Sequence, residues 1–200
     1  MNDCSAGNCA ANPIHYGGDN LGEQENTSSE FTPAIPYRSH LFFYNNTVVN
    51  RMSKSQSWRT AAFDLSLRST TVEAWNNIFV FEGDSNFSWV ELAGRLRLVG
   101  TNLAFGTPTA ARDGALAVNY KVLMEGTLLT AAPGFLSATD FRPGAGSAAI
   151  DAATGVPGGV TVDGKYAHVP VMMEPSLRTN GLSARIPKGS ALDLGALEAH

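Results

Sequence analysis

The chain has 200 residues, of which 44% are hydrophobic and 16% charged, so it is long enough to bury one sizeable core and lacks the bias of a disordered segment. Its formal net charge is −4 and no Lys/Arg cluster occurs, which excludes the electrostatic footprint of a nucleic-acid-binding protein. No window approaches the roughly 18 apolar residues of a membrane span. Gly, Pro, Ser, Thr, Asn and Val are plentiful, which favours an all-β fold.

Residues 1–11 form an expected loop segment, rich in Gly, Ser and Asn, at the amino-terminal edge of the fold. They contain neither the basic region nor the apolar core of a signal peptide. Cys4 and Cys9 could close a small loop disulfide in an oxidising compartment, or remain two unbridged loop cysteines. A zinc site would need two further ligands, and His15 is the only nearby candidate, so we predict no metal site here.

Strand-like segments follow in triplets over residues 12–111. The first triplet is NPIHYGG, HLFFYNN and TVVN; the second is AAFDLSL, TTVEAWNN and IFVFEG; the third is SWVELAG, RLRLVGTN and LAFG. Repeats of roughly this length with three short strands each are typical of a parallel β-helix or a related solenoid. We therefore predict about three coils over residues 12–111.

Asparagines recur between the second and third strand of each triplet, as Asn45 and Asn46, then Asn76 and Asn77, and then Asn102. Asn tolerates the left-handed backbone conformation that a sharp bend requires. Its amide both donates and accepts, so asparagines stacked from coil to coil can form a hydrogen-bonded ladder. We predict that these asparagines are structural.

Three residues in the first-strand positions are candidates for catalysis. Strand alternation in AAFDLSL predicts Phe63 and Leu65 inward and Asp64 outward. Asp64 and Glu91 could form a carboxylate pair on adjacent coils, because the separation that glycoside hydrolases need is close to one or two strand spacings. His15 could act as a general base. The alternatives are a surface or loop role for His15 and a solvated polar face for the two carboxylates.

The loop RMSKSQSWRT contains the candidate substrate-binding residues. Trp58 lies near Lys54 and Arg59, and Arg68 follows in the next loop, so this region could present a sugar platform. Trp58 could equally fold back as an anchor of the loop.

Residues 112–200 contain many Gly and Pro residues and form an expected irregular closing segment packed along the coils. We expect a short strand early in residues 113–135 and a final strand formed by Leu192, Leu194 and Leu197. Asp151 and Asp193 are interpreted as turn or cap residues rather than catalytic ones.

The order of these motifs resembles right-handed parallel β-helix proteins of the pectate-lyase-like superfamily, over roughly residues 12–198. The resemblance rests on FFYNNTVVN, EAWNNIFVF, GFLSATDFRPGAGSAAIDAA and ALDLGALE, close to the carboxy-terminal end of such proteins. Ala148 stands where Pro is usual, and Leu197 stands where an aromatic residue is usual.

The resemblance implies an all-β, right-handed parallel β-helix that is extracellular or periplasmic. It implies the carboxy-terminal part of a polysaccharide lyase or hydrolase acting on acidic polysaccharide, with the main catalytic coils outside this chain; calcium is a cofactor that the family admits. The alternative is a non-catalytic module for glycan binding or surface attachment. We expect a monomer whose open first coil is prone to association.

Overall fold

The computed structural model describes residues 9–11, 13–16, 40–52, 57–65, 70–83, 87–92, 94–106, 109–111, 122–155, 173–175 and 181–199. Over these ranges the regular elements are all strands. They are β1 (Cys9–Ala11), β2 (Ile14–Tyr16), β3 (His40–Tyr44), β4 (Thr47–Asn50), β5 (Ser57–Leu65), β6 (Thr71–Trp75), β7 (Ile78–Phe81), β8 (Phe87–Leu92), β9 (Arg95–Leu98), β10 (Thr101–Phe105), β11 (Thr109–Ala111), β12 (Val122–Met124), β13 (Thr127–Leu129), β14 (Met173–Pro175) and β15 (Leu182–Ala184). The all-β prediction is confirmed for this part of the chain.

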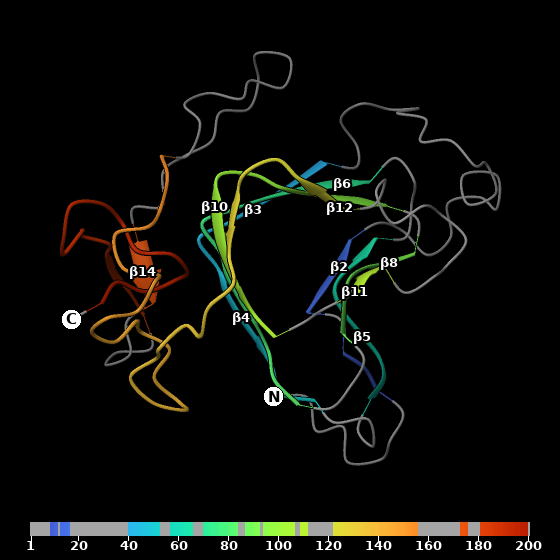
Figure 1. Cartoon of the computed structure of the whole chain (residues 1–200), viewed down its shortest axis with the longest axis horizontal. Coiled ribbons are helices and arrows are strands. Elements are labelled where there is room, and N and C mark those ends of the chain that lie inside the picture. Colours follow the sequence, from blue (N-terminus) through green and yellow to red (C-terminus); the bar gives the residue numbers. More distant parts are fainter. Residues whose placement is uncertain are drawn as a thin grey trace.

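Thirteen of the strands, β1 to β13, form three parallel sheets. The first sheet contains β1, β5, β8 and β11, with β2 also paired to β5; the second contains β3, β6, β9 and β12; the third contains β4, β7, β10 and β13. The chain enters the second, third and first sheets in the same order on each passage, which we call a coil. Figure 1 shows the three sheets arranged around a common interior.

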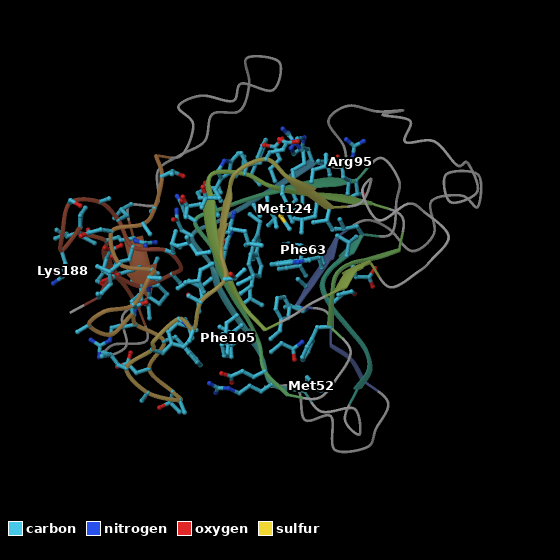
Figure 2. The ribbon with its side chains drawn as sticks, viewed as in Figure 1. Met52, Phe63, Arg95, Phe105, Met124 and Lys188 are labelled. Carbon is cyan, nitrogen blue, oxygen red and sulfur yellow. The ribbon has the colours of Figure 1, made fainter. Side chains whose placement is uncertain are left out.

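A core of aromatic and aliphatic side chains fills this interior. Phe63 is fully buried and points between the sheets (Figure 2), as the alternation in AAFDLSL predicts. Its ring packs edge-on against Phe43 at 5.2 Å and Phe79 at 5.9 Å, and Trp89 packs edge-on against Phe79 at 5.0 Å. Aromatic side chains from all three sheets therefore pack against one another inside the coils.

Left-handed residues turn the chain from the second sheet into the third. Asn45 and Asn76 both have φ of 55°, and Gly100 has φ of 61° at the same bend of the next coil. Asn102 was expected at this bend, but it lies inside β10, two residues after Gly100. The physical reason is that Gly100 supplies the left-handed conformation without the cost that a Cβ adds.

The asparagine ladder runs through Asn46, Asn77 and Asn102. Asn46 Nδ2 donates to Asn77 Oδ1 at 3.2 Å, and Asn77 Nδ2 donates to Asn102 Oδ1 at 3.0 Å. The backbone amides of Asn46 and Asn77 donate to the same oxygens, at 2.9 and 3.1 Å. The side-chain oxygens of Asn77 and Asn102 therefore each accept two hydrogen bonds from the preceding coil, one from a side-chain amide and one from a backbone amide at the bend.

The closing segment covers the outer face of the third sheet. Ile78, Val80 and Leu103 pack there with Ala149 and Leu194 in a second apolar cluster. In Figure 1 the orange and red segment lies beside β4 and β10, outside the ring of sheets. The expected strand at residues 192–197 does not form, although Leu194 packs in this cluster and Leu197 is also buried.

Asn76 joins this segment to the coils through its side chain. Asn76 Nδ2 donates to the Thr154 carbonyl at 2.8 Å, and Thr154 N donates to Asn76 Oδ1 at 3.0 Å. Gly195 N donates to the Asn76 carbonyl at 2.7 Å, and Ala196 N donates to Thr47 Oγ1 at 3.1 Å.

Strands β12 and β13 extend the second and third sheets by one further strand each, in residues that the sequence assigns to the closing segment. Strands β14 and β15 pair antiparallel and form a separate two-stranded sheet. The regular part of the coils therefore continues to residue 129.

A buried ion pair fixes the last turn of the chain. Arg185 Nε donates to Glu198 Oε1 at 2.6 Å, and its other nitrogens donate to the carbonyls of Gly195 and Asp193, both at 2.8 Å. Asp193 Oδ1 accepts from Asp151 N at 2.8 Å, and Asp151 Oδ1 accepts from Ala191 N at 3.0 Å. Asp151 and Asp193 thus have the turn and cap roles predicted for them.

Candidate functional site

The three candidate catalytic positions occupy one row of the first sheet. His15 in β2 pairs with Asp64 in β5, and Asp64 pairs with Glu91 in β8, as Cα partners in parallel register. Neighbouring strands of a sheet lie about 4.8 Å apart, so the backbone places His15 and Glu91 on either side of Asp64, each one strand spacing away from it. The side chains of His15 and Glu91 lie outside the described part of the structure.

Asp64 is the member of this row whose side chain is described. It is 7% exposed, while Phe63 and Leu65 on either side of it are fully buried in the core. A carboxylate so far removed from water interacts more strongly with a neighbouring charge than one on an open face.

The candidate sugar platform is described only in part. Trp58 and Arg59 lie in β5, where Arg59 pairs with Ala10 of β1, but their side chains are outside the described residues. Lys54 and Arg68 fall in the gaps at residues 53–56 and 66–69. Their predicted role therefore stays a prediction.

A chain of charged contacts crosses the outer face of the second sheet. His40 Nε2 lies 3.1 Å from Glu73 Oε1, although the buried nitrogen makes no aligned hydrogen bond there. Glu73 Oε1 also accepts from Arg97 Nη1, and Arg97 Nε donates to the two oxygens of Glu125 at 3.0 and 3.1 Å. The hydrogen bond to Glu125 raises the pKa of Arg97 above its already high usual value, so this guanidinium stays charged.

Aromatic rings line the same face beside the charged contacts. The rings of His40 and Phe42 are stacked at 4.5 Å, and those of Phe42 and Trp75 are stacked at 5.9 Å. These residues are not among the site residues predicted from the sequence. The alternation in HLFFYNN, TTVEAWNN and RLRLVGTN is the signal that could have found them, because it places His40, Glu73 and Arg97 on one face of the sheet.

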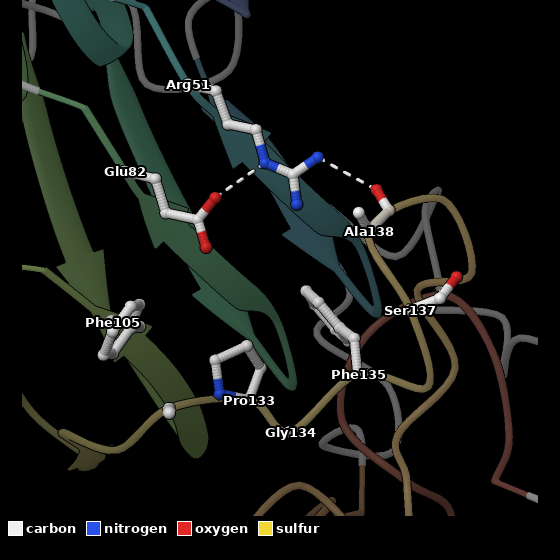
Figure 3. Close-up of a pocket in the computed structure, with 9 residues that line it drawn as sticks. Arg51, Glu82, Phe105, Pro133, Gly134, Phe135, Ser137 and Ala138 are labelled. Carbon is white, nitrogen blue, oxygen red and sulfur yellow. Dashed lines mark hydrogen bonds and ion pairs between the residues drawn. The ribbon is translucent and has the colours of Figure 1, made fainter.

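A groove of about 630 Å³ lies where the third sheet meets the closing segment (Figure 3). One wall holds Arg51 and Glu82, which follow β4 and β7, together with Phe105 of β10. The opposite wall is the loop at residues 132–138, which contributes Pro133 and Phe135. Arg51 Nε donates to Glu82 Oε2 at 2.6 Å, and Arg51 Nη1 donates to the Ala138 carbonyl at 2.9 Å. The ion pair therefore also ties the loop to the sheet.

The described residues contain no group of three or more His, Cys, Asp or Glu side chains that could hold a metal ion. The calcium that the family resemblance admits therefore finds no cluster of acidic ligands in this part of the chain. The described residues also contain no helix long and apolar enough to cross a membrane.

Comparison with known proteins leaves the family open. No family model, curated protein or solved structure matches the chain.

Proposed function

We propose that the chain is a right-handed parallel β-helix of the pectate-lyase-like superfamily that acts on acidic polysaccharide, as a lyase or hydrolase, at the first sheet. The observation that carries the proposal is the register of His15, Asp64 and Glu91 on three neighbouring strands. Three residue types that transfer protons at a sugar thereby fall within one row, in a sheet whose inner face is filled by the core. The asparagine ladder and the recurring order of the three sheets support the β-helix assignment.

Two reactions fit this row, and they give different products. One strand spacing between Asp64 and Glu91 matches the separation of about 5–5.5 Å that retaining glycoside hydrolases need between nucleophile and acid/base. In a lyase, His15 would instead remove the proton next to the uronate carboxylate, and a cation would neutralise that carboxylate. Lys54, Arg59 and Arg68 are the candidates for that cation.

The second candidate is glycan binding without turnover, with the protein outside the cell or in the periplasm. The outer face of the second sheet favours it, because the half-buried, stacked rings of His40 and Phe42 lie there beside charged donors and acceptors. Aromatic faces combined with hydrogen-bonding groups suit sugars, whose rings have both apolar faces and hydroxyls.

A product assay distinguishes these possibilities. The chain is incubated with a panel of acidic polysaccharides, and three readouts are recorded: ultraviolet absorbance of an unsaturated product, new reducing ends, and retardation in a glycan-affinity gel. Absorbance with reducing ends indicates the lyase, reducing ends alone indicate the hydrolase, and retardation alone indicates the binding module. The absence of all three contradicts the proposal in both forms.

A further inference from the structure

The groove between the third sheet and the closing segment is a built site rather than a gap between loops. Its loop wall is held by an isolated antiparallel bridge between Phe135 and Pro143, and Gly144 N donates to the Gly134 carbonyl at 2.7 Å. The rings of Phe135 and Phe141 pack edge-on at 5.3 Å. A wall with this many internal contacts is ordered before any ligand arrives, which lowers the entropic cost of binding.

The sheet wall of the groove presents the ring of Phe105, which lies just beyond the apolar cluster between the third sheet and the closing segment. Along the outer face of the third sheet, Val80 is covered by the closing segment. Its pairing partner in the next coil is Phe105, which is 38% exposed and lines the groove. The ring is therefore fixed by β10 on one side and open on the other.

The polar end of the groove carries unused hydrogen-bonding capacity. Arg51 is held at Nε by Glu82, at Nη1 by Ala138 and by the ring of Phe141, 5.7 Å from its guanidinium carbon. Neither Arg51 Nη2 nor Glu82 Oε1 bonds to a residue in the described part of the chain. The wall therefore offers a fixed donor and a fixed acceptor side by side.

We propose that this groove binds one ring of a neutral saccharide, stacked on Phe105, with its hydroxyls shared between Arg51 and Glu82. A hydroxyl both donates and accepts, so it can satisfy the guanidinium and the carboxylate together. Because the two charges compensate, the site has no net attraction for a uronate. The volume of about 630 Å³ lies within the usual range of small-molecule sites.

The groove is a site separate from the row on the first sheet, so the two proposals stand or fall by different measurements. Here binding is followed by isothermal titration calorimetry with two neutral probes, cellohexaose and mannohexaose, and with hexagalacturonate as the acidic probe. We expect a neutral probe to bind in the groove. The acidic probe can also bind at the first sheet, so we expect Phe105→Ala to change its affinity by less than about twofold. Product formation from polysaccharide is measured separately.

Substitutions locate the binding in the groove. Phe105→Ala and Glu82→Ala should each weaken binding of the neutral probe by about tenfold, because the first removes the stacking ring and the second removes the hydrogen-bond acceptor. Leu136→Ala is the matched control: Leu136 is 48% exposed and lies beside Phe135, but it does not line the groove. It should change affinity by less than about twofold. Thermal unfolding verifies that each variant is folded.

Three results would overturn the proposal. They are failure of the neutral probes to bind the wild-type chain, a loss of hexagalacturonate affinity on Phe105→Ala as large as the loss for the neutral probes, and equal losses of neutral-probe affinity for Phe105→Ala and Leu136→Ala. A chain that cleaves uronate polysaccharide but binds neither neutral probe would disprove the groove site alone.

Discussion

Asn77 Nδ2 donates a hydrogen bond to Asn102 Oδ1 at 3.0 Å, although 25 residues separate them in the chain. The same Asn77 side chain accepts two bonds from Asn46 and donates to the Phe43 carbonyl at 2.9 Å. One buried amide thus joins three consecutive coils. It is the contact through which the sequence repeat becomes a repeat in space.

Asn77→Ala should therefore destabilise the fold by about 2–4 kcal/mol, since each lost bond is worth about 0.5–1.5 kcal/mol and its partners stay buried. Asn46→Ala is the control at the less buried end of the ladder, where Asn46 Nδ2 donates to the Tyr44 carbonyl and Asn77 Oδ1. It should cost about 1 kcal/mol. Urea unfolding measures both, and equal losses would contradict the central position of Asn77.

The two left-handed asparagines should respond differently to glycine. The Asn45 amide is 5% exposed and makes no hydrogen bond with the described residues, whereas the Asn76 amide holds Thr154. Asn45→Gly keeps the bend and removes an unsatisfied amide, so we expect a change within about 1 kcal/mol of zero. Asn76→Gly should cost about 2–3 kcal/mol. Thermal or urea unfolding measures the stability of the two variants. An equal loss of stability in both would contradict the different roles of the two amides.

The Arg185 and Glu198 side chains are 0% and 1% exposed, so their ion pair is fully buried. Arg185→Met should cost about 3–5 kcal/mol, because it leaves the carboxylate buried without its partner. Adding Glu198→Leu should recover about half of that loss, because apolar groups replace buried pairs at low cost. Chemical denaturation of the single and double variants tests this. Additive losses would mean that the two residues do not act as a pair.

Burial raises the pKa of Glu198 above its ordinary value of 4.5, against the lowering effect of Arg185. The folded chain therefore holds this proton more tightly than the unfolded chain. The stability contributed by Glu198 is fully present below pH about 4.5 and is lost as the pH rises through the folded-state pKa.

Glu198→Gln cannot ionise and lacks this dependence. We expect the wild-type chain to be more stable relative to Glu198→Gln at pH 4 than at pH 7, as measured by urea unfolding at the two pH values. Groups shared by both chains cancel in the difference. A difference that is constant, or that grows with pH, would show that the folded state does not favour the protonated carboxyl.

The sequence predicted the strands and the ladder well because both depend on local chemistry. The amide of Asn77 can donate and accept hydrogen bonds wherever it lies, and the apolar–polar alternation around Phe63 indicates which side chains face the core. The bend at Gly100 was missed because Gly satisfies the same backbone requirement as Asn without continuing the asparagine pattern. The strand at residues 192–197 was expected from its leucines, yet Gly195, with φ of 85°, breaks the extended path.

The candidate sites were harder to predict because they depend on which coils lie beside one another. The row through Asp64 and Glu91 could be proposed because both positions fall in equivalent strands. The groove could not, because Arg51 and Phe135 meet only through the return of the closing segment, 84 residues later, to the third sheet. No spacing within one coil encodes that contact.

The most direct test of the catalytic row compares product formation by the wild-type chain, Asp64→Asn, Glu91→Gln and Asp140→Asn on the polysaccharide that gives the strongest signal. Asp140 is the control, because this carboxylate lies in the closing segment, where it accepts from Arg142 Nε at 2.8 Å. We predict that Asp64→Asn and Glu91→Gln each lower the rate by at least about a hundredfold, while Asp140→Asn leaves it nearly unchanged. Equal rates in all four chains would contradict a catalytic role for the row at the first sheet.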